Sequence, residues 1–276
     1  MGLTSLRSTL SERLVVKGEL SVGIVVVLAA VYGLLIGSFL TVVTDRVPQG
    51  LSIVAPRSRC GACGATLGPV DLVPVVSWAV LRGRCRRCHT DIGKEAVLLE
   101  LGTAGLFVAM ALHFGGVWAT IAFCILSAGL LALSIIDLRT KRLPRQISYV
   151  TLALGSPVLV AAALAQDEPR RIATMVGGAV LALAFMWIVY AVSRGGMGDG
   201  DVRLSPLLGA YLGWLGLPYV AVGLFLGFLF GSIVGVAGMA TGKAGRKTEV
   251  PFGPFLALGT IVTVFVGRSI IDALWG

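Results

Sequence analysis

The chain has 276 residues, of which 56% are hydrophobic and 13% charged, and its formal net charge is +9. Soluble domains carry about 25% charged residues, so this deficit excludes an ordinary soluble domain and indicates helices that face lipid. The basic residues stand in short segments between apolar runs, which is typical of the loops of membrane proteins. We therefore expect the lipid bilayer, and not a nucleic acid, as the partner of this chain.

Uncharged runs predict an all-α polytopic membrane protein with about eight transmembrane helices. The first run is 25 residues long, longer than the apolar part of a signal peptide, so we expect a retained helix. Two runs are too long for one helix and predict two each, with breaks at Gly115-Gly116 and Gly216-Leu217-Pro218. The runs are Leu20–Thr44, Leu101–Ile136, Gln146–Gln166, Ile172–Ser193, Leu204–Ala240 and one from near Val250 to Gly267; the sixth helix, near Leu204–Leu215, is short.

Three parts follow from this pattern: an N-terminal tail with the first transmembrane helix (1–44), a polar four-Cys loop (45–100) and a membrane core of about seven helices (101–276). If the loop is cytoplasmic, alternation puts the segments 137–145, 194–203 and 241–249 on the same side. These four segments hold 17 of the 23 Lys and Arg residues. That segregation is expected of cytoplasmic loops and supports the helix count, although the basic N-terminal tail fits it less well.

The polar loop contains two CxxC pairs, Cys60-Gly-Ala-Cys63 and Cys85-Arg-Arg-Cys88, with 21 residues between them. Two such pairs can offer four thiolates to one tetrahedral zinc ion, although the spacer is slightly longer than usual. Two disulfides or a redox-active pair are the alternatives, and a cytoplasmic location argues against stable disulfides. Because four thiolates leave no coordination position open, we expect a structural zinc ion. His89 is interpreted as a surface residue and Cys124 as a small buried hydrophobe.

Two aspartates stand at the ends of predicted transmembrane helices. Asp137 ends an apolar run and, taken alone, could be an interfacial residue beside Arg139. Asp201 lies in Gly198-Asp-Gly-Asp201, just before the sixth helix, where a flexible loop with solvated acids is the alternative. The eight-helix topology puts both at the cytoplasmic ends of their helices. Two carboxylates at one depth can share a proton, so that one activates water and the other polarises a scissile carbonyl.

Other hydrolytic chemistry is not indicated by the sequence. The chain has only two His residues, His89 and His113, and neither stands near an evident nucleophile, which argues against a Ser–His or Cys–His triad. The residue pattern therefore favours an aspartyl protease.

On these residues the chain resembles the bacterial prepilin peptidases (leader peptidase/N-methyltransferases), which are GxGD-type intramembrane aspartyl proteases. The resemblance covers nearly the whole chain. Besides the two CxxC pairs, it is carried by Gly37-Ser-Phe-Leu40, Ser134-Ile-Ile-Asp137 with Leu143-Pro144, Gly198-Asp-Gly-Asp201, and Pro251-Phe-Gly-Pro-Phe255. The chain departs from the family's pattern at Thr41, Arg145 and Arg203, which leaves the protease motifs intact.

The resemblance implies that Asp137 and Asp201 are catalytic and that Asp199 is the variable position of GxGD. It implies cleavage of basic leader peptides from type IV prepilin or pseudopilin precursors at the cytoplasmic face of the bacterial inner membrane. Many family members then methylate the new N-terminus with S-adenosylmethionine, so this cofactor is expected beside zinc.

Three other readings remain at this point. A transporter or channel would have acidic residues near the centres of its spans, and none of the predicted spans contains one. A methyltransferase without protease activity would not need both Asp137 and Asp201. A preflagellin peptidase or a non-catalytic assembly factor is the third, and relatives of the preflagellin type lack the four-Cys loop.

Overall fold

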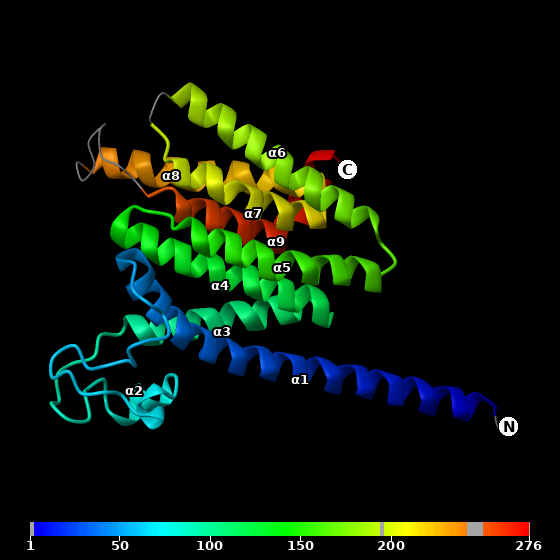
Figure 1. Cartoon of the computed structure of the whole chain (residues 1–276). Coiled ribbons are helices and arrows are strands. Elements are labelled where there is room, and N and C mark those ends of the chain that lie inside the picture. Colours follow the sequence, from blue (N-terminus) through cyan, green and yellow to red (C-terminus); the bar gives the residue numbers. More distant parts are fainter. Residues whose placement is uncertain (1–2, 194–195, 242–250, 276) are drawn as a thin grey trace. The chain divides into compact units, whose positions relative to one another are not determined.

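The computed structural model describes the backbone of residues 3–193, 196–241 and 251–275. The regular secondary structure of these residues is helical (Figure 1). The helices are α1 (Leu3–Arg46), α2 (Val76–Val80), α3 (Glu95–Phe114), α4 (Val117–Thr140), α5 (Arg145–Ala165), α6 (Arg170–Ser193), α7 (Asp199–Leu215), α8 (Leu217–Ala240) and α9 (Gly253–Trp275), with short 3₁₀ helices η1 (Val47–Gln49) and η2 (Pro69–Leu72). Of the predicted connection 241–249, all but Thr241 lies outside the described residues.

Seven of the described helices are long and apolar enough to cross a membrane: α1 from Val22, and α3, α4, α5, α6, α8 and α9. The prediction of an all-α integral membrane protein is therefore confirmed. The sixth predicted span corresponds to α7, whose 17 residues make it about 26 Å long. It is a complete helix, but shorter than the other seven.

Both predicted breaks in the long apolar runs are present. Gly115 follows α3 with φ of 61°, and Gly216 separates α7 from α8 with φ of 147°, values that favour glycine. The helices begin earlier than predicted, α3 at Glu95 and α7 at Asp199. Acidic residues are favourable in the first turn of a helix, and both helices begin with such residues. The uncharged runs therefore mark only the apolar part of each helix, and the charged first turns were not included in the predicted helices. Asp201 accordingly lies inside the first turn of α7, and not before it.

The chain folds into two compact units. The first comprises Met1–Phe39 and Ser58–Thr120, and contains most of α1, the cysteine loop and α3. Within it, α1 and α3 approach each other at backbone distance: a Cβ atom added at Gly37 would lie 2.6 Å from the α-carbon of Glu100. The second comprises Leu40–Arg57 and Ile121–Gly276, and contains η1 and α5 to α9 with most of α4.

Helix α7 is the centre of the second unit. It contacts α5, α6, α8 and α9, and all of its residues from Leu207 to Trp214 are buried. A helix that is buried on all sides belongs to the core of a bundle, which explains how a short helix can stand among longer ones. It packs closely on α6, where a Cβ atom added at Gly209 would overlap the carbonyl oxygen of Gly178.

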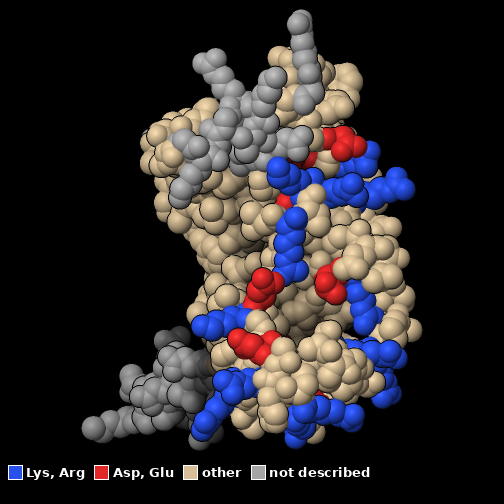
Figure 2. Space-filling model, turned by 90° about the vertical axis from the view of Figure 1, so that its left-hand side faces the viewer, with Lys and Arg blue, Asp and Glu red and all other residues tan. Residues whose placement is uncertain are grey.

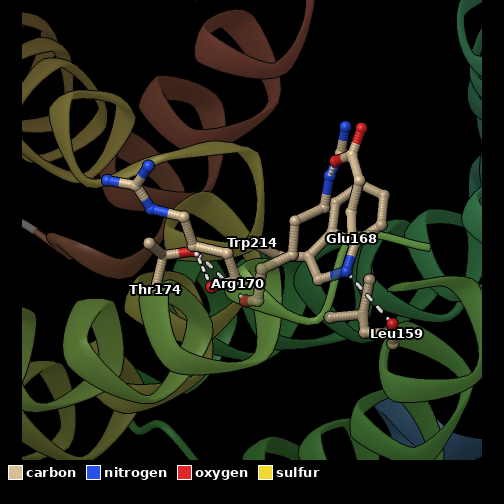
Figure 3. A network of polar contacts seen from close by, with 6 residues as sticks. Leu159, Glu168, Arg170, Thr174 and Trp214 are labelled. Atoms are coloured by element: carbon tan, nitrogen blue, oxygen red, sulfur yellow. Dashed lines mark hydrogen bonds and ion pairs between the residues drawn. The ribbon is translucent and has the colours of Figure 1, made fainter. Parts of the chain in front are cut away.

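The C-terminal end of α7 is held by a network of polar contacts (Figure 3). The indole N–H of Trp214 donates a hydrogen bond of 3.0 Å to the carbonyl oxygen of Leu159 on α5. The guanidinium group of Arg171 lies 4.4 Å from the centre of the Trp214 ring and pairs with Glu168, an arrangement typical of a cation–π contact. These contacts fix the end of α7 that lies away from Asp201.

Candidate active site and cysteine cluster

A cavity of 580 Å³ lies in the second unit where several helix ends meet. It is lined by Asp137 near the end of α4, by Lys141–Pro144 in the connection to α5, and by Gly198–Asp201 at the start of α7. Val47 and Pro48 of η1 and Pro251 and Phe252 before α9 complete the lining. Four segments far apart in the sequence, including three of the motifs singled out above, thus meet around one cavity.

Asp137 is 5% exposed and is oriented by the backbone at the start of α9. The Gly253 N–H donates a hydrogen bond of 3.0 Å to Oδ2 of Asp137. A Cβ atom at position 253 would lie 2.8 Å from this same oxygen and 2.9 Å from Cδ2 of Leu143. Gly253 is therefore the residue that lets the backbone approach the carboxylate.

Asp201 is also 5% exposed, in the first turn of α7. Its Oδ1 atom is buried and has no hydrogen-bond partner within the described part of the chain. A buried polar atom without a partner is costly, and here it belongs to a side chain that lines the same cavity as Asp137. The cavity is therefore lined by two buried carboxyl groups, one with an N–H donor and one with an oxygen that has no partner within the described residues.

Asp199 differs from Asp201 although it lines the same cavity. Its side chain is 64% exposed and pairs with Arg203 at 2.7 Å, one helical turn away. Because it is exposed and paired with Arg203, the Asp199 side chain is not enclosed in the bundle as that of Asp201 is. The structure thus separates the two aspartates of Gly198-Asp-Gly-Asp201 by burial.

Basic residues stand at the rim of this cavity. Lys141 and Arg142 line it, and the connection α4–α5 and the start of α7 lie at the same end of the second unit (Figure 1). Figure 2 views the molecule from this end and shows many Lys and Arg side chains with fewer Asp and Glu. Within the cavity lining, two basic residues, Lys141 and Arg142, therefore accompany the buried carboxyl groups.

In the first unit, the four cysteines of the loop form one cluster. The Sγ atoms of Cys60, Cys63, Cys85 and Cys88 all lie within 4.8 Å of one another, and those of Cys60 and Cys88 are 3.7 Å apart. Tetrahedral coordination with Zn–S bonds of about 2.3 Å requires sulfur atoms about 3.8 Å apart. The cluster therefore fits a four-coordinate metal ion such as zinc.

The two CxxC turns are built alike. In the first, the Gly64 N–H donates to the Cys60 carbonyl at 2.9 Å, and in the second the His89 N–H donates to the Cys85 carbonyl at 3.0 Å. Gly64 and His89 both have positive φ, 67° and 57°. His89 thus occupies the turn position that glycine occupies in the first pair, and it is exposed, as expected of a surface residue.

Hydrogen bonds lower the pKa of two of the four thiols, Cys60 and Cys88. The Ala65 backbone also lowers the pKa of Cys63, but the Cys88 side chain, burial and the other two thiols outweigh this effect and raise that pKa to about 11. The side chain and then the backbone of Thr90 lower the pKa of Cys88 to about 6, and the backbone amides of Cys63 and Ala62 lower the pKa of Cys60. Thiolates, and not thiols, are metal ligands. Cys124 is buried in α4, apart from the cluster, which agrees with its interpretation as a small hydrophobe.

The sequence did not predict that the Gly253 N–H binds Asp137 or that Leu143 packs beside the cavity. Both belong to motifs of the sequence, Pro251–Phe255 and Leu143-Pro144, but nothing in their residue types shows which side chain they contact. A Cβ atom added at Gly200 would also meet Leu143, at 2.9 Å. Leu143 therefore packs between the two glycines that stand next to the two buried aspartates.

Comparison with known proteins matches two family models to the chain. The bacterial peptidase A24 N-terminal domain matches residues 31–114, and the type IV leader peptidase family matches residues 124–236. No solved structure matches the chain.

Several curated proteins are similar to the chain along most of its length. A prepilin leader peptidase/N-methyltransferase of Bacillus subtilis is 32% identical over 88% of this chain and 94% of the relative. A protein with the same name from Pseudomonas aeruginosa is 34% identical over 86% of this chain and 89% of the relative. A type 4 prepilin-like proteins leader peptide-processing enzyme of Escherichia coli O78:H11 is 37% identical over 87% of this chain and 93% of the relative.

Proposed function

This chain belongs to the type IV leader peptidase family, and we propose that it cleaves the leader peptide of type IV prepilin or pseudopilin precursors and then methylates the new N-terminus. The observation that carries the protease assignment is the cavity in which Asp137 and Asp201 are both buried. The glycines Gly198 and Gly200 near the start of α7 also line this cavity. In this proposal the apolar helix of the precursor lies in the bilayer, beside the helix ends that form the cavity.

In the proposed mechanism, Asp137 is the base. Its Oδ2 accepts the Gly253 N–H, and an N–H donor stabilises an ionised carboxylate. Asp137 takes a proton from a water molecule, whose oxygen attacks the scissile carbonyl carbon. Asp201 begins as the protonated acid and donates its proton to the carbonyl oxygen. The proton held by Asp137 then passes to the leaving nitrogen as the C–N bond breaks. One hydroxyl of the gem-diol gives its proton back to Asp201 as the carboxyl product forms, so the pair again holds one shared proton.

We further propose that the active site faces the cytoplasm of the bacterial inner membrane. The four segments that alternation assigns to one side hold 17 of 23 Lys and Arg residues, and positive residues are retained in cytoplasmic loops. The division into 1–44, 45–100 and 101–276 remains part of this proposal, with the four-Cys loop on the same side.

The proposed metal site comprises Cys60, Cys63, Cys85 and Cys88. Zinc held there would have four thiolate ligands and no open position, so it would fix the fold of the loop and take no part in hydrolysis. For the second reaction we propose S-adenosylmethionine as the methyl donor, in keeping with the names of the relatives.

The test is cleavage of a type IV prepilin precursor by the purified full chain in detergent or membranes. Asp137→Asn and Asp201→Asn should each lower the rate by about 10² to 10⁴-fold, the usual cost of losing general acid–base catalysis. Asp199→Asn is the matched control, because it removes a carboxylate from the same turn that is exposed, and it should keep cleavage within about tenfold.

Folding of each variant is checked by zinc content and thermal unfolding. If Asp137→Asn or Asp201→Asn cleaves at nearly the wild-type rate while folded, the aspartyl mechanism is wrong. Transport or methyl transfer alone would then become the leading function.

A further inference from the structure

The segment of the cysteine loop from η2 to α2 exposes a patch of apolar side chains. Val70, Val76 and Val80 are 66%, 57% and 73% exposed, and Leu72 and Val73 are 45% and 42% exposed. Val76 and Val80 are four residues apart and lie on one face of α2, and α2 packs on η2. We call these five residues the valine patch. Single exposed apolar residues are ordinary, but five within eleven positions indicate a surface that something covers.

A hydrogen bond sets the position of this patch along α3. The Val75 N–H donates to Oε2 of Glu100 at 2.7 Å, and Glu100 is 6% exposed. Helix α3 has 20 residues, about 30 Å, which equals the thickness of the hydrocarbon core. If Glu95 lies at one boundary, Glu100 lies about 7.5 Å further along the axis. The start of α2 is therefore beside the second turn of a membrane helix, and not beyond the end of that helix.

The neighbours of Glu100 on α3 support this depth. Leu98 and Leu101 are 66% and 50% exposed on a helix that is apolar and long enough to span a membrane, as expected of side chains that face lipid. Val75 lies within the segment that carries the valine patch, and its N–H is hydrogen-bonded to Glu100, which lies between Leu98 and Leu101. If the valine patch did not contact lipid, its apolar side chains would be exposed to water at the depth where the bilayer begins.

The charges next to the patch fit a membrane surface. Arg82, Arg84 and Arg87 are exposed, and Arg86 pairs with Asp71 at 2.8 Å. Basic residues beside an apolar surface are typical of segments that lie in the interface of an anionic bilayer. A backbone bond from Gly83 to the Trp78 carbonyl, 2.8 Å, keeps this basic turn against α2.

We propose that the η2–α2 segment is a membrane anchor, with the valine patch inserted at the headgroup–acyl boundary and Arg82, Arg84 and Arg87 on anionic lipid phosphates. The cysteine loop then lies on the bilayer, held by Glu100 at one point and by lipid along α2. This anchor does not depend on the proposed cleavage reaction, and its test does not measure activity.

The test uses the full chain with zinc bound, reconstituted into vesicles of phosphatidylethanolamine and phosphatidylglycerol. A genetically encoded, environment-sensitive fluorescent amino acid replaces Val80 in one protein and Ala62 in another. Ala62 is the matched control, because it is an exposed small apolar residue of the same loop, in the first CxxC turn. Lipids brominated near the headgroup end of the acyl chain quench a fluorophore only at that depth.

We expect strong quenching and a blue-shifted emission at position 80, with little quenching at position 62. Replacing phosphatidylglycerol by a neutral lipid should weaken the quenching at position 80, and the variant R82Q/R84Q/R87Q should remove that lipid dependence while keeping its zinc. The proposal is overturned if both positions are equally open to aqueous iodide. It is also overturned if position 80 becomes shielded only when a prepilin precursor is added, since the patch would then bind protein.

Discussion

Asp199 and Asp201 are two residues apart in the sequence, yet their surroundings are opposite. Asp201 is 5% exposed, with a buried oxygen that has no partner within the described residues, whereas Asp199 is 64% exposed and paired with Arg203. On a helix, positions two apart point to different sides. Because both stand in the first turn of α7, one side chain is directed into the bundle and the other to its surface. The resemblance to GxGD proteases implies that Asp201 is catalytic and Asp199 variable, and the difference in burial supports that prediction.

At the residue scale, the first prediction concerns Gly253. Gly253→Ala would place a Cβ atom 2.8 Å from Oδ2 of Asp137 and displace that carboxylate. We expect the rate of precursor cleavage to fall by about 10²-fold, the order of effect that a misplacement of about 1 Å produces. Gly235→Ala is the control, since a Cβ atom there meets nothing within 4 Å. Equal rates for both variants would show that the Gly253 contact does not position Asp137.

The second prediction concerns the cysteine cluster. Cys85→Ser removes one of four ligands, so we expect loss of bound zinc, measured by metal analysis of the purified protein. Cys124→Ser alters a buried cysteine outside the cluster and should keep its zinc. A Cys85→Ser protein that retains a full complement of zinc would contradict the assignment of the ligands.

At the element scale, α7 is the helix on which the site depends. It carries Asp201 at its start and is buried against α5, α6, α8 and α9. Trp214 ties its other end to Leu159 and Arg171. A helix fixed along its whole length cannot rotate or slide easily, which keeps Asp201 in the cavity of Asp137. Helix α7 is the hardest helix to recognise from the sequence, because it has only 17 residues. Its residues are buried by the neighbouring helices.

The third prediction tests the contact between α6 and α7. Gly178→Ala would add a Cβ atom that overlaps the Gly209 carbonyl oxygen, so the helices must separate. We expect a loss of about 1–3 kcal/mol in stability and a lower apparent Tm in detergent. Gly177→Ala is a control in the neighbouring position, where the nearest atom is Cδ2 of Leu217 at 3.7 Å, and it should leave the Tm unchanged. If both variants unfold at the wild-type temperature, the close helix contact is not required.

At the scale of the whole molecule, the distribution of basic residues predicts the orientation in the membrane. The connection α4–α5 and the start of α7 lie at one end of the second unit (Figure 1), and Lys141 and Arg142 in that connection line the cavity. The connection α5–α6 lies at the other end, with Glu168, Arg170 and Arg171. Because positive loops are retained in the cytoplasm, we propose that the cavity lies on that side.

The fourth prediction tests this orientation. A green fluorescent protein fused after Thr140 should fluoresce, and an alkaline phosphatase fused after Gln166 should be active, because the first folds in the cytoplasm and the second needs the exterior. The exchanged pair of fusions is the control and should give neither signal. The opposite pattern would place the active site on the outer face and would contradict cleavage at the cytoplasmic side.

The sequence alone determined the class of protein, the helices and the residues worth testing. Charge-free runs long enough for a bilayer predicted the helices, since lipid excludes charge at every position of a span. The glycine breaks were readable because the positive φ at Gly115 and Gly216 favours one residue type. The two CxxC pairs indicated the cysteine cluster, because ligand spacing is local.

Only the tertiary structure decided which groups meet. The hydrogen bond from Gly253 to Asp137 joins residues 116 positions apart, and no periodicity or propensity encodes such a contact. The burial of α7, the exposure of Asp199 and the bond between Val75 and Glu100 likewise depend on neighbours from other parts of the chain. Local patterns fix helices because backbone hydrogen bonds are local, whereas a cavity is formed by side chains whose packing involves the whole bundle.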